Sequence, residues 1–228
     1  MHIVVLAGPE MAAEFKLKFP ESGSSHRFSF LHSHSLIDEQ LEPTDIVFDF
    51  LIYQYPERLS YYAPEQVVFC NTATAQLAAM VKQAGLAGHP CTLFGFNGLP
   101  SLFNRPVLEV SLINSDDEER LKAICEELGT DYLLVEDRVG MVTPRMLCMI
   151  INEACYTLQE RTAGINDIDL GMKLGTNYPK GPFEWANQIG VANVYHVLEA
   201  MYNDTKEERY KVCPLLKTKY LTGQKFEV

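Results

Sequence analysis

Short apolar runs alternate with helical hydrophobic spacing over the first 136 residues, and this alternation restricts the possible folds more than any other feature. Residues 3–7 form an apolar run that ends at Gly8-Pro9, and helical spacing follows over residues 10–19. Further apolar runs, each typical of a buried strand, occupy residues 28–31, 45–52, 67–70, 92–96, 107–112 and 132–135. This order predicts an α/β domain with a largely parallel sheet.

The pattern changes after residue 136, where only helical spacing remains. Helices are expected at residues 145–159, 166–174, 185–189 and 191–202, and the tail from residue 204 is polar and mixed. We therefore predict two domains, an α/β domain at residues 1–136 and an all-α domain at residues 137–228. The helix at 145–159 is apolar on two faces, so it is either buried or pairs with another subunit.

Charge and composition exclude several classes of partner. The formal net charge is −11, which argues against binding to nucleic acid or to an anionic membrane surface. The six cysteines include no CxxC pair, which indicates reduced thiols and a cytoplasmic protein. No apolar run reaches the roughly 20 residues that a membrane span needs. No His, Cys and carboxylate grouping has the spacing of metal ligands, so no metal is expected.

Local signals mark the ends of two helices. Residues 115–119 read Ser-Asp-Asp-Glu-Glu, a capping residue followed by acids that favour a first helical turn. Gly129 follows Leu128 and predicts the end of that helix. Residues 71–74, Asn-Thr-Ala-Thr, predict a turn and the cap of a second helix that runs to Gly85.

A loop rich in Gly, Pro and Asn, residues 175–190, reads GTNYPKGPFEWANQIG and contains the only Trp of the chain. This loop, the Asn152-Glu153-Ala154 segment and the terminal Pro214-Leu215-Leu216 resemble landmarks of the 3-hydroxyacyl-CoA dehydrogenases. The resemblance implies a Rossmann-like NAD-binding domain followed by a helical dimerisation domain. It also implies NAD as cofactor, an acyl-CoA ligand and a homodimer formed through the C-terminal helices. Phe183 and Trp185 are interpreted as anchors of the loop.

The family oxidises a hydroxyl group with a His base that a Glu orients. Its His lies in an H-F-x-N-P motif, which in this chain reads Phe94-Gly95-Phe96-Asn97-Gly98, so that Phe94 stands at the His position. Glu109, in a Val-Leu-Glu-Val segment, resembles the orienting Glu without its partner. A phenyl ring cannot accept a proton. His89 is the nearest histidine in sequence and is interpreted as a solvated loop residue.

The resemblance assigns substrate contacts to four further positions, Asn71, Ala73, Asn97 and Pro144. The family has a Ser where this chain has Ala73, and it has an Asn at the domain junction where this chain has Pro144. Both replacements remove a group that could form a hydrogen bond to the substrate.

The cofactor turn is altered as well. The family opens with G-x-G-x-x-G, in which the glycines let the backbone approach a pyrophosphate. Only Gly8 remains in this chain, Pro9 lacks an N–H donor, and Glu10 adds a negative charge. Asp38 and Glu39 are candidates for the acid that binds a ribose, but they are interpreted as solvated residues.

Three functions are compatible with these residues. The first is a diverged family member, a pseudoenzyme that lacks the standard NAD-dependent oxidation and binds acyl-CoA or an active relative. The second is an active dehydrogenase or related acyl-CoA enzyme with rearranged catalytic groups around Glu109, Asn97 and Tyr53. The third is a dimeric interaction module.

Overall fold

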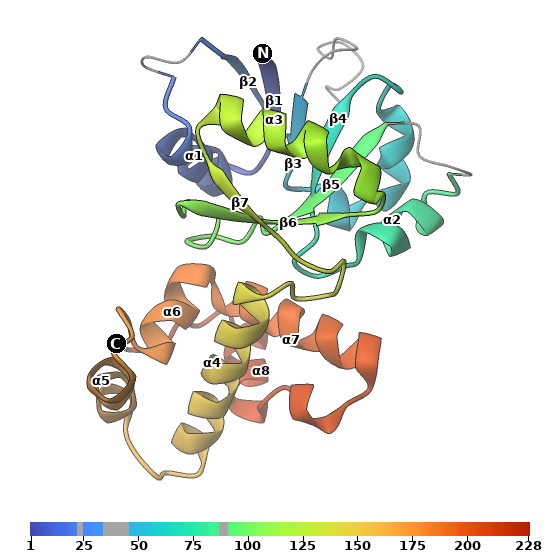
Figure 1. Cartoon of the computed structure of the whole chain (residues 1–228). Helices are drawn as coiled ribbons and strands as arrows, with labels where there is room; N and C mark the ends of the chain where they lie inside the picture. Colours follow the sequence, from blue (N-terminus) through green and yellow to red (C-terminus); the bar gives the residue numbers. More distant parts are fainter. Residues whose placement is uncertain (22–24, 34–45, 87–90) are drawn as a thin grey trace. The chain divides into compact units, whose positions relative to one another are not determined.

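The computed structural model describes residues 1–21, 25–33, 46–86 and 91–228. The chain separates into two compact units, Met1–Met141 and Val142–Val228, which are described one at a time (Figure 1). The first is an α/β unit and the second contains only helices. The predicted fold class, a Rossmann-like domain followed by an all-α domain, is confirmed. The predicted domain boundary between residues 136 and 137 stays a prediction.

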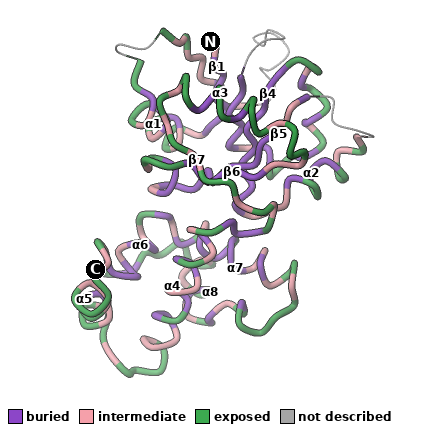
Figure 2. The backbone as a smooth tube through the Cα atoms, in the orientation of Figure 1, coloured by how far each residue is buried: buried purple, intermediate pink, exposed green. Residues whose placement is uncertain are grey.

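Seven strands form one sheet in the order β2-β1-β3-β4-β5-β6-β7. The strands are β1 (His2–Leu6), β2 (Arg27–Leu31), β3 (Ile46–Asp49), β4 (Val67–Asn71), β5 (Thr92–Phe96), β6 (Val107–Leu112) and β7 (Asp131–Leu134). Neighbours are parallel except β5 and β6, so β6 and β7 run opposite to the other five. The central strands β3 and β4 are buried throughout, which explains their continuous apolar sequence (Figure 2).

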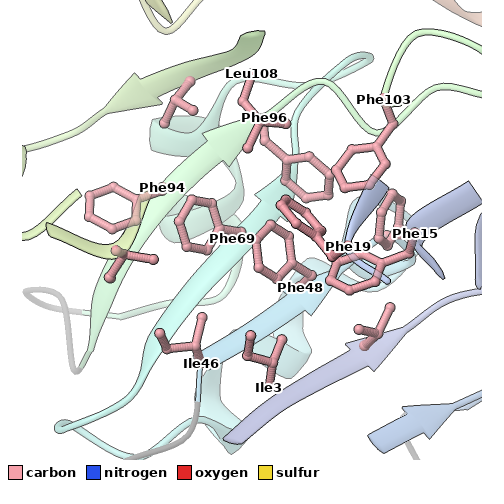
Figure 3. Close-up of a cluster of buried hydrophobic side chains, with 14 of the residues drawn as sticks. Ile3, Phe15, Phe19, Ile46, Phe48, Phe69, Phe94, Phe96, Phe103 and Leu108 are labelled. Atoms are coloured by element: carbon pink, nitrogen blue, oxygen red, sulfur yellow. The ribbon is translucent and has the colours of Figure 1, made fainter. Parts of the chain in front are cut away.

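Helices cover both faces of the sheet. Residues of α1 (Pro9–Lys18) and α3 (Glu118–Leu128) pack on one face. Residues of α2 (Leu77–Gln83) and the 3₁₀ segment η3 (Pro56–Tyr61) pack on the other. The first face carries a phenylalanine cluster, which consists of Phe15, Phe19, Phe48, Phe50, Phe69, Phe94, Phe96 and Phe103. Figure 3 labels all of these residues except Phe50. The ring pairs of the cluster are mostly tilted or edge-on, as aromatic pairs prefer, and Phe48 stacks on Phe69 with centroids 4.4 Å apart.

The predicted end of α3 at Gly129 is confirmed, but its predicted cap is wrong: Ser115 lies in a 3₁₀ turn before the helix, and the N-cap residue is Asp117, whose side chain forms no cap bond. The side chain of Asn114 accepts a hydrogen bond from the Asp116 amide at 3.1 Å, and a 3₁₀ turn, η4 (Ser115–Asp117), leads into the helix. Gly129 ends the helix with φ +67°, a left-handed conformation that glycine adopts without strain.

The start of α2 differs from the prediction, because no side chain of residues 71–74 caps it. The Asp137 carboxylate, 60 residues away in sequence, accepts the Leu77 amide at 2.8 Å and the Ala78 amide at 2.9 Å. A long-range acid therefore satisfies the free amides that a local cap was expected to bind.

The second unit contains α4 (Thr143–Gln159), α5 (Ile165–Thr176), α6 (Pro182–Ile189), α7 (Val191–Thr205) and α8 (Pro214–Leu221). Helix α4 packs against α6, α7 and α8 and buries Leu147, Cys148 and Ile151. Helix α5 is mostly exposed, with Asp169 as its buried residue (Figure 2). Helix α8 lies in the tail for which no helix was predicted. In the described parts of the chain, no helix is long and apolar enough to cross a membrane.

Candidate functional site

Asn71 is the last residue of β4, and its buried amide joins three loops at the carboxyl edge of the sheet. Its Oδ1 accepts hydrogen bonds from the amides of Ala73 at 3.3 Å and Gly98 at 3.2 Å. Its Nδ2 donates to the Phe50 carbonyl at 3.4 Å. A Cβ on residue 98 would lie within 3.0 Å of this amide, so glycine is required there. The polar atoms of Asn71 are thus occupied by contacts within the protein.

Ala73 is buried immediately after this strand end. Its carbonyl accepts the Gly140 amide at 3.0 Å, so its backbone holds the chain just before the second unit begins. Its methyl group cannot form a hydrogen bond. The preceding Thr72 donates from Oγ1 to the Phe96 carbonyl at 3.5 Å and to the Met141 Sδ at 3.6 Å.

The register of β5 on β6 determines which side chains share a face of the sheet. Phe94 pairs with Leu112, Gly95 with Ser111, and Phe96 with Val110. Successive side chains in a strand point to opposite faces. Phe94 and Phe96 belong to the phenylalanine cluster, and Phe94 is fully buried with its ring centroid 5.0 Å from that of Phe69 (Figure 3).

Glu109 lies in β6 between Leu108 and Val110, which both pack in that cluster. Its side chain therefore points to the other face of the sheet, where it is 9% exposed. Leu93 and Gly95 of β5 point to this same face, whereas Phe94 and Phe96 point to the face of the phenylalanine cluster. Phe94 and Glu109 therefore lie on neighbouring strands, but their side chains are on opposite faces of the sheet.

Asn97 follows β5 and continues the pairing with β6. Its amide donates to the Glu109 carbonyl at 3.4 Å, and its Oδ1 accepts the Leu99 amide at 3.3 Å. Ser111 is buried, and its Oγ has no hydrogen-bond partner within the described residues. A Cβ on Gly95 would overlap the Ser111 Oγ and contact the Thr72 Oγ1 at 2.7 Å. Small and polar groups thus fill the space beside Glu109.

Two other predicted positions belong to other elements. Tyr53 is in the 3₁₀ segment η2 (Ile52–Gln54) beyond β3, where its hydroxyl accepts a hydrogen bond from the Gln54 Nε2 at 2.9 Å. It is 37% exposed. Pro144 is buried in the first turn of α4, in the second unit, a position that suits a residue without an N–H.

The turn between β1 and α1 is poorly suited to a dinucleotide. Gly8 is the N-cap of α1, with φ −66°, and a Cβ on it would meet no atom within 4 Å, so no close backbone approach requires glycine there. Pro9 removes a donor from the first turn, and Glu10 is exposed beside it. A pyrophosphate binds at such a turn through free amides and bare glycines. This turn supplies few of either.

In Rossmann folds the acid that binds the ribose lies at the end of the second strand. In this chain the residue that follows that strand is a histidine. Leu31 is the last residue of β2, and the next residue, His32, has its Nδ1 3.1 Å from the Ala7 carbonyl. Asp38, Glu39 and His89 lie outside the described residues. Within the residues that the structure describes, no three His, Cys, Asp or Glu side chains are grouped to hold a metal ion.

Sequence reasoning missed a buried acid at the end of β3. The Asp49 carboxylate accepts the Tyr62 hydroxyl at 2.7 Å and the Leu51 amide at 2.8 Å. Burial, and then the charge of Asp49, raise the pKa of Tyr62 well above its ordinary value. The Tyr62 hydroxyl therefore stays protonated and donates to Asp49. The sequence signal that could have identified this residue is an acid at the end of an otherwise apolar strand.

The loop of residues 175–190 is held by Asp169 of α5. Its carboxylate accepts the amides of Phe183 at 2.8 Å and Glu184 at 3.1 Å. Burial raises the pKa of Asp169, although these two bonds oppose the shift. The Glu184 carboxylate binds Lys173 at 2.8 Å and the Gly181 amide at 2.9 Å, and these contacts lower the pKa of Glu184. The loop is thus fixed within the unit by its own charges.

Aromatic side chains complete the same loop. Phe183 is fully buried, and its ring centroid lies 4.7 Å from that of Phe226. The ring centroids of Trp185 and Tyr178 are 5.4 Å apart. The interpretation of Phe183 and Trp185 as anchors of the loop agrees with this burial.

Comparison with known proteins supports a single family. Residues 140–226 match the model of the 3-hydroxyacyl-CoA dehydrogenase C-terminal domain. A 3-hydroxyadipyl-CoA dehydrogenase of Escherichia coli K12 is 38% identical over 122 residues, 53% of this chain and 26% of the relative. A 3-hydroxybutyryl-CoA dehydrogenase of Bradyrhizobium diazoefficiens is 30% identical over 168 residues, 71% of this chain and 55% of the relative.

The chain thus spans about half, or less, of the length of these two relatives. A crystal structure of Mycobacterium tuberculosis FadB2 has the same fold, with a TM-score of 0.79 at 15% identity over 98% of this chain and 94% of that one. The C-terminal match and these relatives show that the chain belongs to the 3-hydroxyacyl-CoA dehydrogenase family.

Proposed function

We propose that this protein is a diverged member of its family that no longer performs the standard NAD-dependent oxidation of 3-hydroxyacyl-CoA. The observation that carries the proposal is the register of β5 on β6. It puts Phe94 in the phenylalanine cluster and leaves Gly95, which has no side chain, opposite Ser111 on the face that Glu109 occupies.

Oxidation of a secondary alcohol requires a group that takes the hydroxyl proton. Neither Gly95 nor the amide of Asn97 can accept a proton at neutral pH. The described histidines of the first unit have contacts elsewhere: His2 with Ser29 Oγ, His26 with the Glu127 carbonyl, and His32 with the Ala7 carbonyl. Strand β5 therefore supplies no base to Glu109.

The cofactor turn supports the same proposal. Pro9 takes one donor from the first turn of α1, and Glu10 places a carboxylate where a diphosphate would approach. Glu10 is exposed, so water screens its charge. The N–H donor that Pro9 lacks is therefore the stronger of the two arguments against pyrophosphate binding. NAD is a cofactor by family resemblance, and the residues at this turn fit it poorly.

What we expect the protein to retain is binding of an acyl-CoA or of an active relative. The two relatives named above are dehydrogenases of acyl-CoA compounds by name. The test is a pair of calorimetric titrations of the intact protein, one with acetoacetyl-CoA and one with NADH. Heat of binding with acetoacetyl-CoA and none with NADH is expected. Binding of NADH as tight as that of an active relative would contradict the proposal.

An active enzyme with rearranged groups is the second candidate, because Glu109 is a buried acid beside Asn97. A buried carboxylate can serve as a base. In that case Glu109→Gln abolishes turnover while the melting temperature stays nearly constant. If the wild type turns over and Glu109→Gln retains that turnover, Glu109 is not the base.

We also propose a cytoplasmic homodimer formed by the helices of the second unit, which would serve an interaction module equally well. Met146 of α4 and Leu170 and Leu174 of α5 are 58%, 52% and 78% exposed. They accompany a cavity of about 360 Å³ between α4 and α5, lined by Ile150, Ala154, Ile168 and Met172. Light scattering at the monomer mass of 25.8 kDa would contradict the dimer.

A further inference from the structure

The first unit contains a second cavity, of about 290 Å³, that no part of the proposed function uses. It lies between the end of α1, the loop that precedes β6, and the turn from α3 to β7. Lys18, Asn104, Arg105 and Thr130 line it. We infer that this cavity is a binding site for an oxyanion of the phosphate class. The inference does not depend on acyl-CoA binding.

Lys18 supplies a cation that the protein holds in place. Its Nζ donates to the Arg105 carbonyl, and it lies 5.3 Å from the centroid of the Phe19 ring and 5.9 Å from that of Phe103. One of its three protons is used by the carbonyl, which leaves two for a ligand. Partial burial lowers the pKa of Lys18, because the ammonium has lost part of its water. A bound anion would restore that lost stabilisation.

Arg105 supplies a second cation beside the first. Its backbone accepts the Lys18 ammonium, whereas its guanidinium makes no hydrogen bond or ion pair with any residue in the described parts of the chain. A guanidinium presents five N–H donors in a planar fork that matches a phosphate or a carboxylate. This group is therefore available to a ligand.

The Asn104 side-chain amide adds a neutral donor, because it has no partner among the described residues. The Thr130 hydroxyl donates to the Pro106 carbonyl at 3.3 Å and the Asp131 carbonyl at 3.2 Å, so its proton is already used within the protein. No residue that lines the cavity is acidic, as far as the described chain extends. The chain as a whole is acidic, with a net charge of −11, so a cavity lined by two cations is a local region of positive charge.

Two acids that adjoin these segments are bound to other groups or face water. The Glu14 carboxylate accepts the amides of Ser101 at 2.8 Å and Asn104 at 2.9 Å, so it holds the loop that carries Arg105. Asp131 follows Thr130 and is exposed. The cavity is larger than one phosphate group, so the oxyanion can belong to a phosphate ester or to the phosphorylated end of coenzyme A.

The test is a calorimetric titration of the whole protein with inorganic phosphate, followed by adenosine 3′,5′-bisphosphate and coenzyme A. We expect the wild type to bind phosphate and Arg105→Gln to bind it at least tenfold more weakly, since a charge-assisted contact is lost. Asn104→Ala should weaken binding to a smaller extent. Lys82→Gln is the matched control, because Lys82 is exposed on α2 and its loss changes the net charge equally.

The source of the ligand follows from competition. Displacement of phosphate by coenzyme A and by the bisphosphate identifies the coenzyme's phosphorylated end, whereas binding of inorganic phosphate alone identifies a small phosphate ester. Both results support the site. Absence of phosphate binding to the wild type overturns the inference. So does equal weakening in Arg105→Gln and Lys82→Gln, since that pattern reports only net charge.

Discussion

Phe94 and Glu109 lie on the neighbouring strands β5 and β6 with their side chains on opposite faces of the sheet. The phenyl ring of Phe94 packs on Phe69 in the phenylalanine cluster, and the carboxylate of Glu109 points to the face that carries Ser111 and Gly95. A side chain at position 94 therefore cannot contact the Glu109 carboxylate unless the pairing of the two strands changes.

Phe94→His should not create dehydrogenase activity, since the imidazole would enter the phenylalanine cluster. We expect a loss of about 2–4 kcal/mol in the free energy of unfolding, because a polar ring replaces a fully buried apolar one. Urea denaturation measures the loss, with Phe94→Leu as the apolar control that should lose less. Reduction of acetoacetyl-CoA by the Phe94→His protein would show that the register is wrong.

Asp137→Ala should destabilise the first unit through α2. Its carboxylate accepts two amides at the start of that helix, and removal of a helix cap costs about 1–2 kcal/mol. Asp131→Ala removes a nearby exposed acid and provides the control, whose free energy of unfolding should change by less than about 0.5 kcal/mol. Equal effects of the two substitutions would remove Asp137 from this role.

Gly181→Ala should destabilise the second unit strongly. A Cβ on residue 181 would overlap the Asp169 side chain, which is fixed by its bonds to Phe183 and Glu184. A loss of about 2–4 kcal/mol is expected, measured by thermal or chemical denaturation. Gly175→Ala is the matched control, because a Cβ there meets nothing within 4 Å and alanine favours a helix. Tolerance of both substitutions would contradict the packing described for Asp169.

Lys173→Met should change how the stability of the protein depends on pH. Lys173 and then the Gly181 amide hold the pKa of Glu184 below its ordinary value of 4.5, so their contribution is complete above pH 4.5 and is lost as the pH falls below it. The stability difference between wild type and Lys173→Met should therefore be largest above pH 4.5 and shrink at lower pH.

The comparison with the variant is necessary because Asp169 acts in the opposite sense. Burial raises the pKa of Asp169, so the stability linked to its protonated form is lost as the pH rises through that raised value. Lys173 is the first-listed cause that lowers the pKa of Glu184 and only a minor one that lowers the pKa of Asp169, so the difference between the denaturation curves of the two proteins at several pH values reports mainly Glu184. A difference that grows towards low pH would contradict the assignment of Lys173 to Glu184.

Much of the fold could be predicted because it depends on local pattern. The apolar runs identify the strands, and the acids at residues 115–119 together with Gly129 identify the limits of the helix at α3. Helix α8 was not predicted, because its apolar and polar residues alternate without a clear face over Pro214–Leu221. Local pattern does not detect a helix of this kind.

The arrangement of the site depended on pairings that have no local signal. Nothing in residues 92–112 specifies that β6 runs antiparallel to β5 or that Gly95 faces Ser111, and a shift of one residue would exchange the faces. The cap that Asp137 provides to α2 joins residues 60 apart in sequence. The sequence could therefore nominate Glu109 and Phe94, but it could not determine that their side chains diverge.

The most direct test of the central claim is a steady-state assay of the intact protein with acetoacetyl-CoA and NADH, followed by the absorbance of the reduced cofactor. An active relative assayed in parallel provides the reference rate. With no proton acceptor on the Glu109 face of β5, the predicted result is no loss of absorbance above the rate without protein. Turnover comparable to that of the active relative would contradict the account.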